Sequence, residues 1–146
     1  MGERRQITLA AELASLPKFR AFIDGACRAA GLDDTTCYDI KLAVEEACTN
    51  IIDHGYADLE PGSIVLSLQY GGRQMVVRLT DFGHPFEPSE PPTPDAEEAL
   101  ETGRLGGFGI FFIYRSVDHV SYDSTAGSNT LTLIKRLLKS SPSDAR

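Results

Sequence analysis

The chain has 146 residues, of which 42% are hydrophobic and 24% charged, so it is long enough for one domain with a core of ordinary size. Its formal net charge of -7 argues against broad binding to nucleic acid, which needs phosphate-neutralising Lys and Arg on one face. No signal peptide opens the sequence, and no apolar run is long enough to span a bilayer. We therefore expect a cytoplasmic protein, a single domain over residues 1–146, with no membrane or nucleic-acid partner.

Three cysteines, Cys27, Cys37 and Cys48, leave one thiol unpaired in any disulfide scheme. Cys37 and Cys48 fall on or beside the apolar face of one expected helix. Small buried thiols in a reducing compartment are the favoured interpretation. A reactive role for Cys37, which lies near a helix start, is the alternative.

Apolar periodicity and turn residues divide the chain into elements. In chain order they predict a strand over 5–9, a helix from Leu16 to Gly31 with Ser15 as cap, a helix from Asp33 or Asp34 to about His54, strands over 63–70 and 74–80, a Pro-rich loop over 84–102, a helix over 106–116, and strands over 117–122 and 129–137. This order predicts an α+β fold of two layers, with helices on one face of a mixed, mostly antiparallel sheet. We expect a flexible lid over about 84–106 and a frayed tail over 139–146.

The first chemical motif is Glu46-Ala47-Cys48-Thr49-Asn50, inside the second expected helix. Glu46 and Asn50 are four residues apart and share a helical face, and Asp53 extends this stripe by three. The stripe lies roughly opposite the apolar one, so a solvated polar face is one interpretation. The other is functional: the carboxylate would deprotonate a hydroxyl, and the carboxamide oxygen suits magnesium.

The second motif, Asp81-Phe82-Gly83, closes an apolar strand. A carboxylate there could accept a hydrogen bond from an exocyclic amine such as that of adenine, while Gly83 would let the backbone approach the ring. A plain strand-to-loop turn explains the same residues.

The third motif, Gly103-Arg104-Leu105-Gly106-Gly107-Phe108-Gly109, precedes an apolar helix. Unhindered N–H groups and the positive helix end favour an anion, and Arg104 could meet a terminal phosphate. No Lys-Ser or Lys-Thr of a Walker loop follows, and a flexible hinge is the alternative.

Together the motifs resemble the GHKL ATPase superfamily and, within it, the small bacterial anti-sigma factor serine kinases. The resemblance rests on Leu42 to Tyr56, on Asp81-Phe82-Gly83-His84-Pro85-Phe86-Glu87-Pro88, on Gly106 to Ile110 and on Asn129-Thr130-Leu131-Thr132-Leu133. Pro85 stands where the wider superfamily often has a second Gly, which points to the anti-sigma subgroup.

This resemblance implies a Bergerat-type fold, ATP and magnesium as cofactors, and a role for each matching position. Glu46 would be the catalytic base, Asn50 the magnesium ligand, Asp81 the acceptor for the adenine amine and Thr130 its support. The positions that it implies for ATP binding are Asn50, Asp53, Asp81, Gly83, Phe86, Arg104, Gly106, Gly107, Gly109 and Thr130.

The substrate implied by the resemblance is a serine or threonine of an anti-anti-sigma (STAS-domain) protein. The same surface, as a homodimer, would sequester a sigma factor. Two other functions stay open: a non-catalytic, nucleotide-gated binding module, and a detached histidine-kinase catalytic domain.

Overall fold

The structure is a computed structural model that describes residues 3–85 and 107–137. Its elements, in chain order, are β1 (Glu3–Ala10), a 3-10 turn (Leu13–Ser15), α1 (Leu16–Ala30), α2 (Asp34–Asn50), a π-helical turn (Ile51–Gly55), β2 (Ser63–Tyr70), β3 (Gln74–Asp81), α4 (Gly107–Ser116), β4 (His119–Thr125) and β5 (Ser128–Arg136). The expected lid and tail fall largely on 86–106 and 138–146, which lie outside the described residues.

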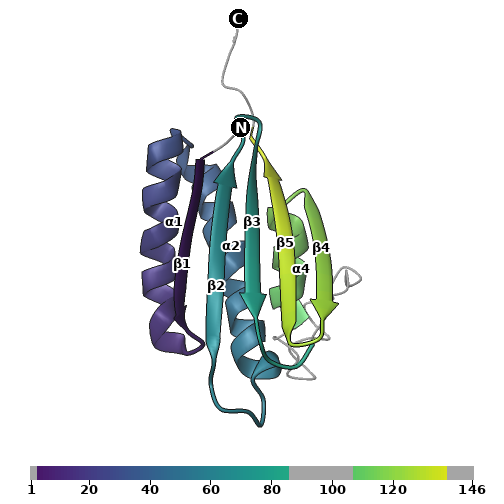
Figure 1. Cartoon of the computed structure of the whole chain (residues 1–146). Helices are drawn as coiled ribbons and strands as arrows, with labels where there is room; N and C mark the ends of the chain where they lie inside the picture. Colours follow the sequence, from purple (N-terminus) through teal and green to yellow (C-terminus); the bar gives the residue numbers. More distant parts are fainter. Residues whose placement is uncertain (1–2, 86–106, 138–146) are drawn as a thin grey trace, which may run out of the picture.

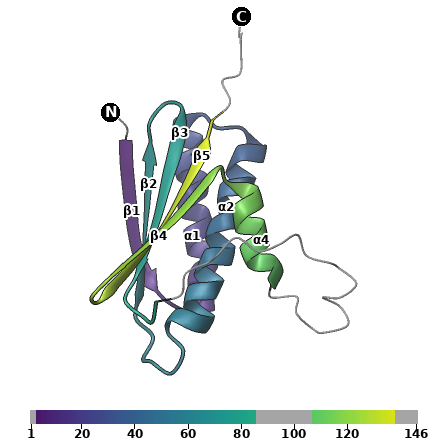
Figure 2. The ribbon, with the colours of Figure 1, turned by 90° about the vertical axis from the view of Figure 1, so that its right-hand side faces the viewer.

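The five strands form one sheet in the order β1-β2-β3-β5-β4. Figure 1 shows the sheet in front of the helices, and Figure 2 shows α1, α2 and α4 together on one of its faces. The α+β class and its two layers are therefore confirmed. Every pairing among the described strands is antiparallel. We expected a mixed, mostly antiparallel sheet, and over these strands the sheet is fully antiparallel.

The core lies between the sheet and the helices. On the inner face of the three strands β2, β3 and β5, alternate residues are buried because strand side chains point to opposite faces in turn. From the helices, Ile23 of α1, Ile40 of α2 and Ile113 of α4 are each at most 1% exposed. α2 lies in the middle of the helical layer and packs against both α1 and α4.

The helix starts confirm one predicted cap and correct another. The Asp33 side chain accepts a hydrogen bond from the Thr36 N–H, so Asp33 caps α2. Ser15 does not cap α1, because the 3-10 turn before it already gives Ser15 a helical backbone, and its hydroxyl instead donates to the Ala10 carbonyl at 2.7 Å. Gly31 ends α1 with a φ of 72°, the left-handed conformation that favours glycine.

The three cysteines are free and buried, as predicted. Burial raises the pKa of all three thiols, and it raises that of Cys48 to about 12. This argues against the reactive role considered for Cys37, since a thiol attacks as its thiolate.

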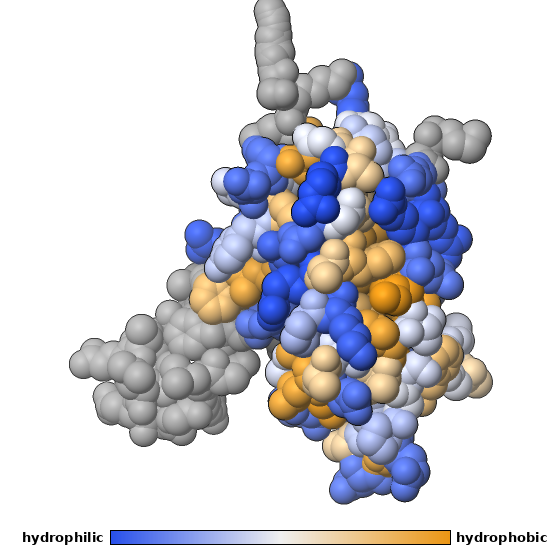
Figure 3. All heavy atoms as spheres, turned by 90° about the vertical axis from the view of Figure 1, so that its left-hand side faces the viewer, coloured by the Kyte–Doolittle hydropathy of each residue, from blue (hydrophilic) through white to orange (hydrophobic). Residues whose placement is uncertain are grey.

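β1 is an edge strand that leaves Ile7 and Leu9 only partly buried against the core. Figure 3 views the molecule from this side, where apolar residues are interspersed with hydrophilic ones. None of the described helices combines the length and the apolar composition that a membrane span requires.

Candidate functional site

A pocket opens between α2, the π-helical turn, the end of β3 with the loop after it, the strands β4 and β5, and α4. The space between these elements that is not filled by atoms, including open solvent at the mouth of the pocket, is about 370 Å³. The lining residues are Ala47, Asn50, Ile51, Gly55, Asp81, His84, Ile113, Tyr122 and Leu131. Two residues of the sequence prediction, Asn50 and Asp81, are thus brought to one pocket.

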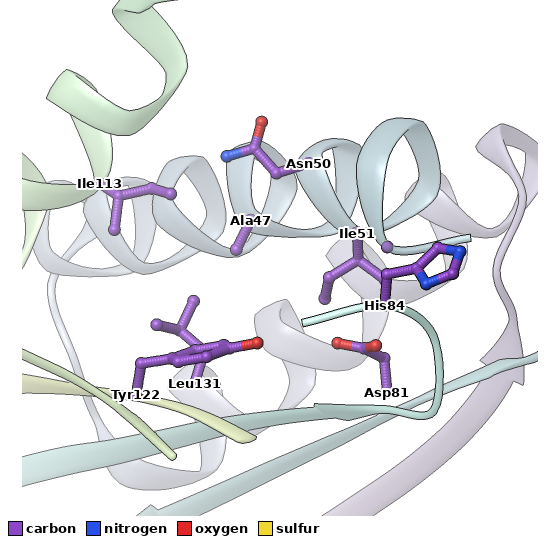
Figure 4. Close-up of a pocket in the computed structure, with 9 residues that line it drawn as sticks. Ala47, Asn50, Ile51, Asp81, His84, Ile113, Tyr122 and Leu131 are labelled. Atoms are coloured by element: carbon purple, nitrogen blue, oxygen red, sulfur yellow. The ribbon is translucent and has the colours of Figure 1, made fainter. Parts of the chain in front are cut away.

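Asp81 is the last residue of β3 and is only 6% exposed. Its Oδ1 accepts two hydrogen bonds, from the Gly83 N–H at 2.9 Å and from Asn129 Nδ2 at 3.0 Å. No bond to its Oδ2 occurs within the described residues. Figure 4 shows the carboxylate directed into the pocket, toward the hydroxyl of Tyr122. The arrangement fixes one oxygen of Asp81 and leaves the other as an acceptor.

Thr130, expected to support Asp81, lies on the opposite face of the sheet. In the register of β3 and β5, Asp81 pairs with Asn129 and Thr80 pairs with Thr130. The Thr130 hydroxyl accordingly lies 3.1 Å from the Thr80 hydroxyl. The expectation was wrong by one position, because neighbouring residues of a strand point to opposite faces.

Gly83 is required by close packing of the backbone at the end of α2. A Cβ on Gly83 would overlap the carbonyl oxygen of Gly55, and the next residue, His84, donates its backbone N–H to that same carbonyl. The lack of a side chain at Gly83 thus lets the loop after β3 dock on the π-helical turn. This role differs from the expected one, a close approach of the backbone to a nucleotide ring.

Tyr56, buried to 8% exposure, joins this loop to the sheet and was missed as a site residue. Its hydroxyl accepts from the Phe82 N–H at 3.0 Å and donates to the Ser63 carbonyl at 2.8 Å. Tyr56 directly follows Gly55 in the helix motif, so its place in the motif was the available signal. Its partners are 7 and 26 residues away, and no spacing rule predicts them.

Asn50, the expected magnesium ligand, carries an unpartnered polar atom. Its Nδ2 is buried and has no hydrogen-bond partner among the residues that the structure describes. In Figure 4, Ala47 and Ile51 point from the helix toward the sheet, whereas Asn50 is directed away from Asp81. A buried donor without a partner is costly, so this amide is well suited to a ligand that completes its bonding.

Glu46, the expected base, is half-buried on α2 and does not line the pocket. Burial, and then the charge of Glu45, raises the pKa of its carboxyl. The described residues give it no hydrogen bond or ion pair. A carboxylate with a raised pKa accepts a proton more readily, which is the property a general base needs.

Asp53 is exposed and does not line the pocket, contrary to the expected stripe. The chain widens into the π-helical turn after Asn50, and the Tyr56 N–H bonds to the Ile51 carbonyl five residues back. The wider turn breaks the i, i+3 relation on which the stripe depended.

The remaining expected positions lie at or before the start of α4. Phe86, Arg104 and Gly106 are outside the described residues. Gly107 and Gly109 belong to the first turn of α4, a helix that packs on α2. Three lining residues, Ile113, Tyr122 and Leu131, were not expected, since apolar and aromatic side chains are equally typical of a core.

Residues 9–135 match the model of the histidine kinase-like ATPase domain. The chain belongs to this family. This confirms the family resemblance drawn from the helix, Asp-x-Gly and glycine motifs, and the family is one of ATPases.

Two curated relatives match parts of the chain. The chain is 33% identical over 85 residues to serine-protein kinase RsbW of Halalkalibacterium halodurans, over 58% of this chain and 51% of that protein. It is 29% identical over 102 residues to anti-sigma F factor of Clostridium novyi, over 70% of this chain and 71% of that protein. The match thus spans only about half the length of the RsbW relative.

A solved structure supports the fold. A chain of Mycobacterium tuberculosis that comprises RsbU and RsbW domains superposes on 92% of this chain, with a TM-score of 0.68 and 23% identity. The match covers 32% of that longer chain. At this identity the likeness establishes the two-layer fold and no more.

Proposed function

We propose that the protein is an ATP-dependent serine/threonine-protein kinase of a partner-switching system. The observation that carries the proposal is the bonding of Asp81. Its Oδ1 is held by two N–H donors, while its Oδ2, which faces the pocket, receives no hydrogen bond from the described residues. The exocyclic amine of adenine would donate to Oδ2. Ala47, Ile51 and Leu131 offer apolar surface to the ring.

The side chain of Asn50 suits a magnesium ion at its end of the pocket. The amide oxygen of Asn50 is a hard ligand, and its buried, unpartnered Nδ2 could donate to a phosphate oxygen. Within residues 3–85 and 107–137, no three His, Cys, Asp or Glu side chains gather to hold a metal. Mg²⁺ is usually held by one or two protein ligands together with phosphate oxygens. When bound, it would neutralise phosphate charge.

Glu46 would take the proton from the attacking seryl or threonyl hydroxyl. The hydroxyl oxygen then bonds to the γ-phosphorus, the bond to the bridging oxygen breaks, and ADP leaves with that electron pair. The raised pKa of Glu46 favours this proton transfer. Arg104, Gly107 and Gly109 keep their proposed places around the phosphates, on the strength of the family match.

The proposed protein substrate is an anti-anti-sigma protein with a STAS domain, and the proposed second partner is a sigma factor sequestered by a homodimer in the cytoplasm. The proposal is supported by the names of the two relatives, a serine-protein kinase and an anti-sigma factor.

A transfer assay tests the proposal. The chain is incubated with magnesium and γ-labelled ATP and with a STAS protein from the same genome, and we expect acid-stable label on a serine or threonine of that protein. Asp81→Asn should weaken ATP binding by about 1.5–3 kcal/mol, measured by calorimetry, because a charge-assisted bond is lost.

Two outcomes would favour the alternatives. ATP-dependent binding of the STAS protein without label transfer would identify a nucleotide-gated binding module. Acid-labile label would identify a histidine-kinase domain. Absence of ATP binding by the unmodified chain would remove all three.

A further inference from the structure

Asn129 lies between Asp81 and the β4–β5 hairpin, and its side-chain amide forms hydrogen bonds on both sides. It is only 2% exposed. Its Nδ2 donates to Asp81 Oδ1 at 3.0 Å and to the Gly83 carbonyl at 2.9 Å, and its Oδ1 accepts from the Ser124 hydroxyl at 2.7 Å. Both N–H bonds and one oxygen lone pair are therefore occupied.

These bonds permit only one orientation of the amide. Turned by 180°, the group would place its oxygen against two acceptors, the Asp81 carboxylate and the Gly83 carbonyl. The three side chains also follow one row of the sheet, since Ser124 pairs with Asn129 on β4 and β5, and Asn129 pairs with Asp81 on β5 and β3. Hydrogen bonds thus connect the row from the hairpin to the pocket.

We propose that Asn129 is the positioning residue that selects a 6-aminopurine nucleotide over a 6-oxopurine one. By holding Oδ1, it turns Oδ2 of Asp81 toward the pocket as a pure acceptor. An amine at C6 of the purine donates to that oxygen, whereas a carbonyl at C6 brings two acceptors together and is rejected. Asn129 acts through Asp81, because both of its N–H bonds and one lone pair of its oxygen are already occupied.

This inference rests on the proposed nucleotide binding, and it predicts a change in selectivity. Asn129→Asp keeps the side chain's shape but replaces the donor with a carboxylate facing Asp81. Repulsion would displace Asp81 from its place against Gly83. We expect the dissociation constant for ADP to rise roughly 10- to 100-fold, that for IDP to change by less than about threefold, and the preference for ADP to disappear.

The experiment is calorimetric titration of the full chain with ADP and with IDP in magnesium, for the unmodified protein, Asn129→Asp, Asn129→Ser and the control Thr132→Val. Thr132 lies on the same strand but on its other face, in register with Arg78, so its substitution should leave the ADP/IDP ratio unchanged. Asn129→Ser adds no charge, which keeps the test valid if the Asp variant does not fold. We expect it to reduce the ratio by about tenfold.

The outcomes separate this inference from the proposed function. An unmodified protein that prefers ADP, with both Asn129 variants keeping that preference within twofold, would overturn the positioning role and leave the kinase proposal standing. An unmodified protein that binds neither nucleotide would overturn both. Thermal unfolding of each variant shows that the measured protein is folded.

Discussion

Glu45 and Glu46 are consecutive residues of α2 with opposite surroundings. Glu45 turns toward α1 and forms an ion pair with Arg20 at 2.6 Å. Beside it, Lys41 pairs with Asp24 at 2.8 Å, and the hydrogen bond from Lys41 is the main reason why the pKa of Asp24 is lowered. On the other side, the pKa of the Glu46 carboxyl is raised, and the buried amide nitrogen of Asn50 has no partner within residues 3–85 and 107–137.

This difference in bonding suggests that one side of α2 serves stability and the other serves binding. Charges at the contact with α1 are paired and favour the folded state. On the other side, Glu46 and Asn50 are left unsatisfied by the described residues, at a cost in stability, which is typical of groups reserved for a ligand. Substitutions on the two sides should therefore have opposite patterns of effect.

The largest expected contrast is between Glu46→Gln and Glu45→Gln in phosphotransfer. Loss of a general base should lower the rate of transfer to the STAS partner roughly 100- to 10,000-fold. Loss of the partly exposed Glu45 pair should change it by only a few fold, since such pairs are worth at most about 1 kcal/mol. Initial rates at saturating ATP measure both. Equal losses in the two variants would show that Glu46 has no special role.

The next contrast concerns two glycines. Gly83→Ala forces a Cβ against the Gly55 carbonyl, a backbone atom that cannot rotate away, and should destabilise the protein by about 1–3 kcal/mol. Gly25→Ala, within α1, meets nothing within 4 Å and should stabilise it by about 0.5–1 kcal/mol. Urea unfolding measures both free energies. A neutral Gly83→Ala would mean that the loop does not dock on the π-helical turn.

A third contrast concerns two tyrosines. Tyr56→Phe leaves the Phe82 N–H and the Ser63 carbonyl without their shared partner and should cost about 1–3 kcal/mol in unfolding free energy. Tyr38→Phe, at a residue 61% exposed, should have almost no effect. The Tyr56 variant should also bind ATP more weakly, because the same loop places Asp81. Similar stabilities for the two variants would contradict the bonding role of Tyr56.

The sequence was sufficient for the elements and for Asp81 and Asn50, because each lies in a pattern that is local along the chain. Asn50 is fixed by helical spacing, and Asp81 by the end of a strand. The contact of Gly83 with Gly55 was not foreseen, since the two residues are distant in sequence and no local pattern indicates it. The expected approach of Gly83 to a nucleotide ring stays a prediction.

Thr130 and Asn129 show where sequence reasoning failed. The motif of the closing strand was recognised, but which of two adjacent residues faces the pocket depends on register, and a shift by one residue exchanges the faces. Asp53 was misplaced because a regular helix was extended through a π-helical turn. The register of β3 and β5 is set by pairing between distant segments, whereas the π-helical turn is a local widening of the helix.

The smallest expected effect is the pH dependence of stability due to Glu46. Its folded-state pKa is raised above the usual 4.5, so ionisation disfavours the folded state. This penalty is absent below the unfolded pKa and complete above the folded one. Glu46→Gln should therefore be the more stable protein at pH 7, by roughly a few tenths of a kcal/mol because the group is partly exposed, and its advantage should vanish below about pH 4. Urea unfolding across this range measures the difference. An advantage that grows on acidification would mean that the ionised carboxylate is stabilised by contacts in the folded state, and Glu46 would then belong with Glu45 among the paired charges.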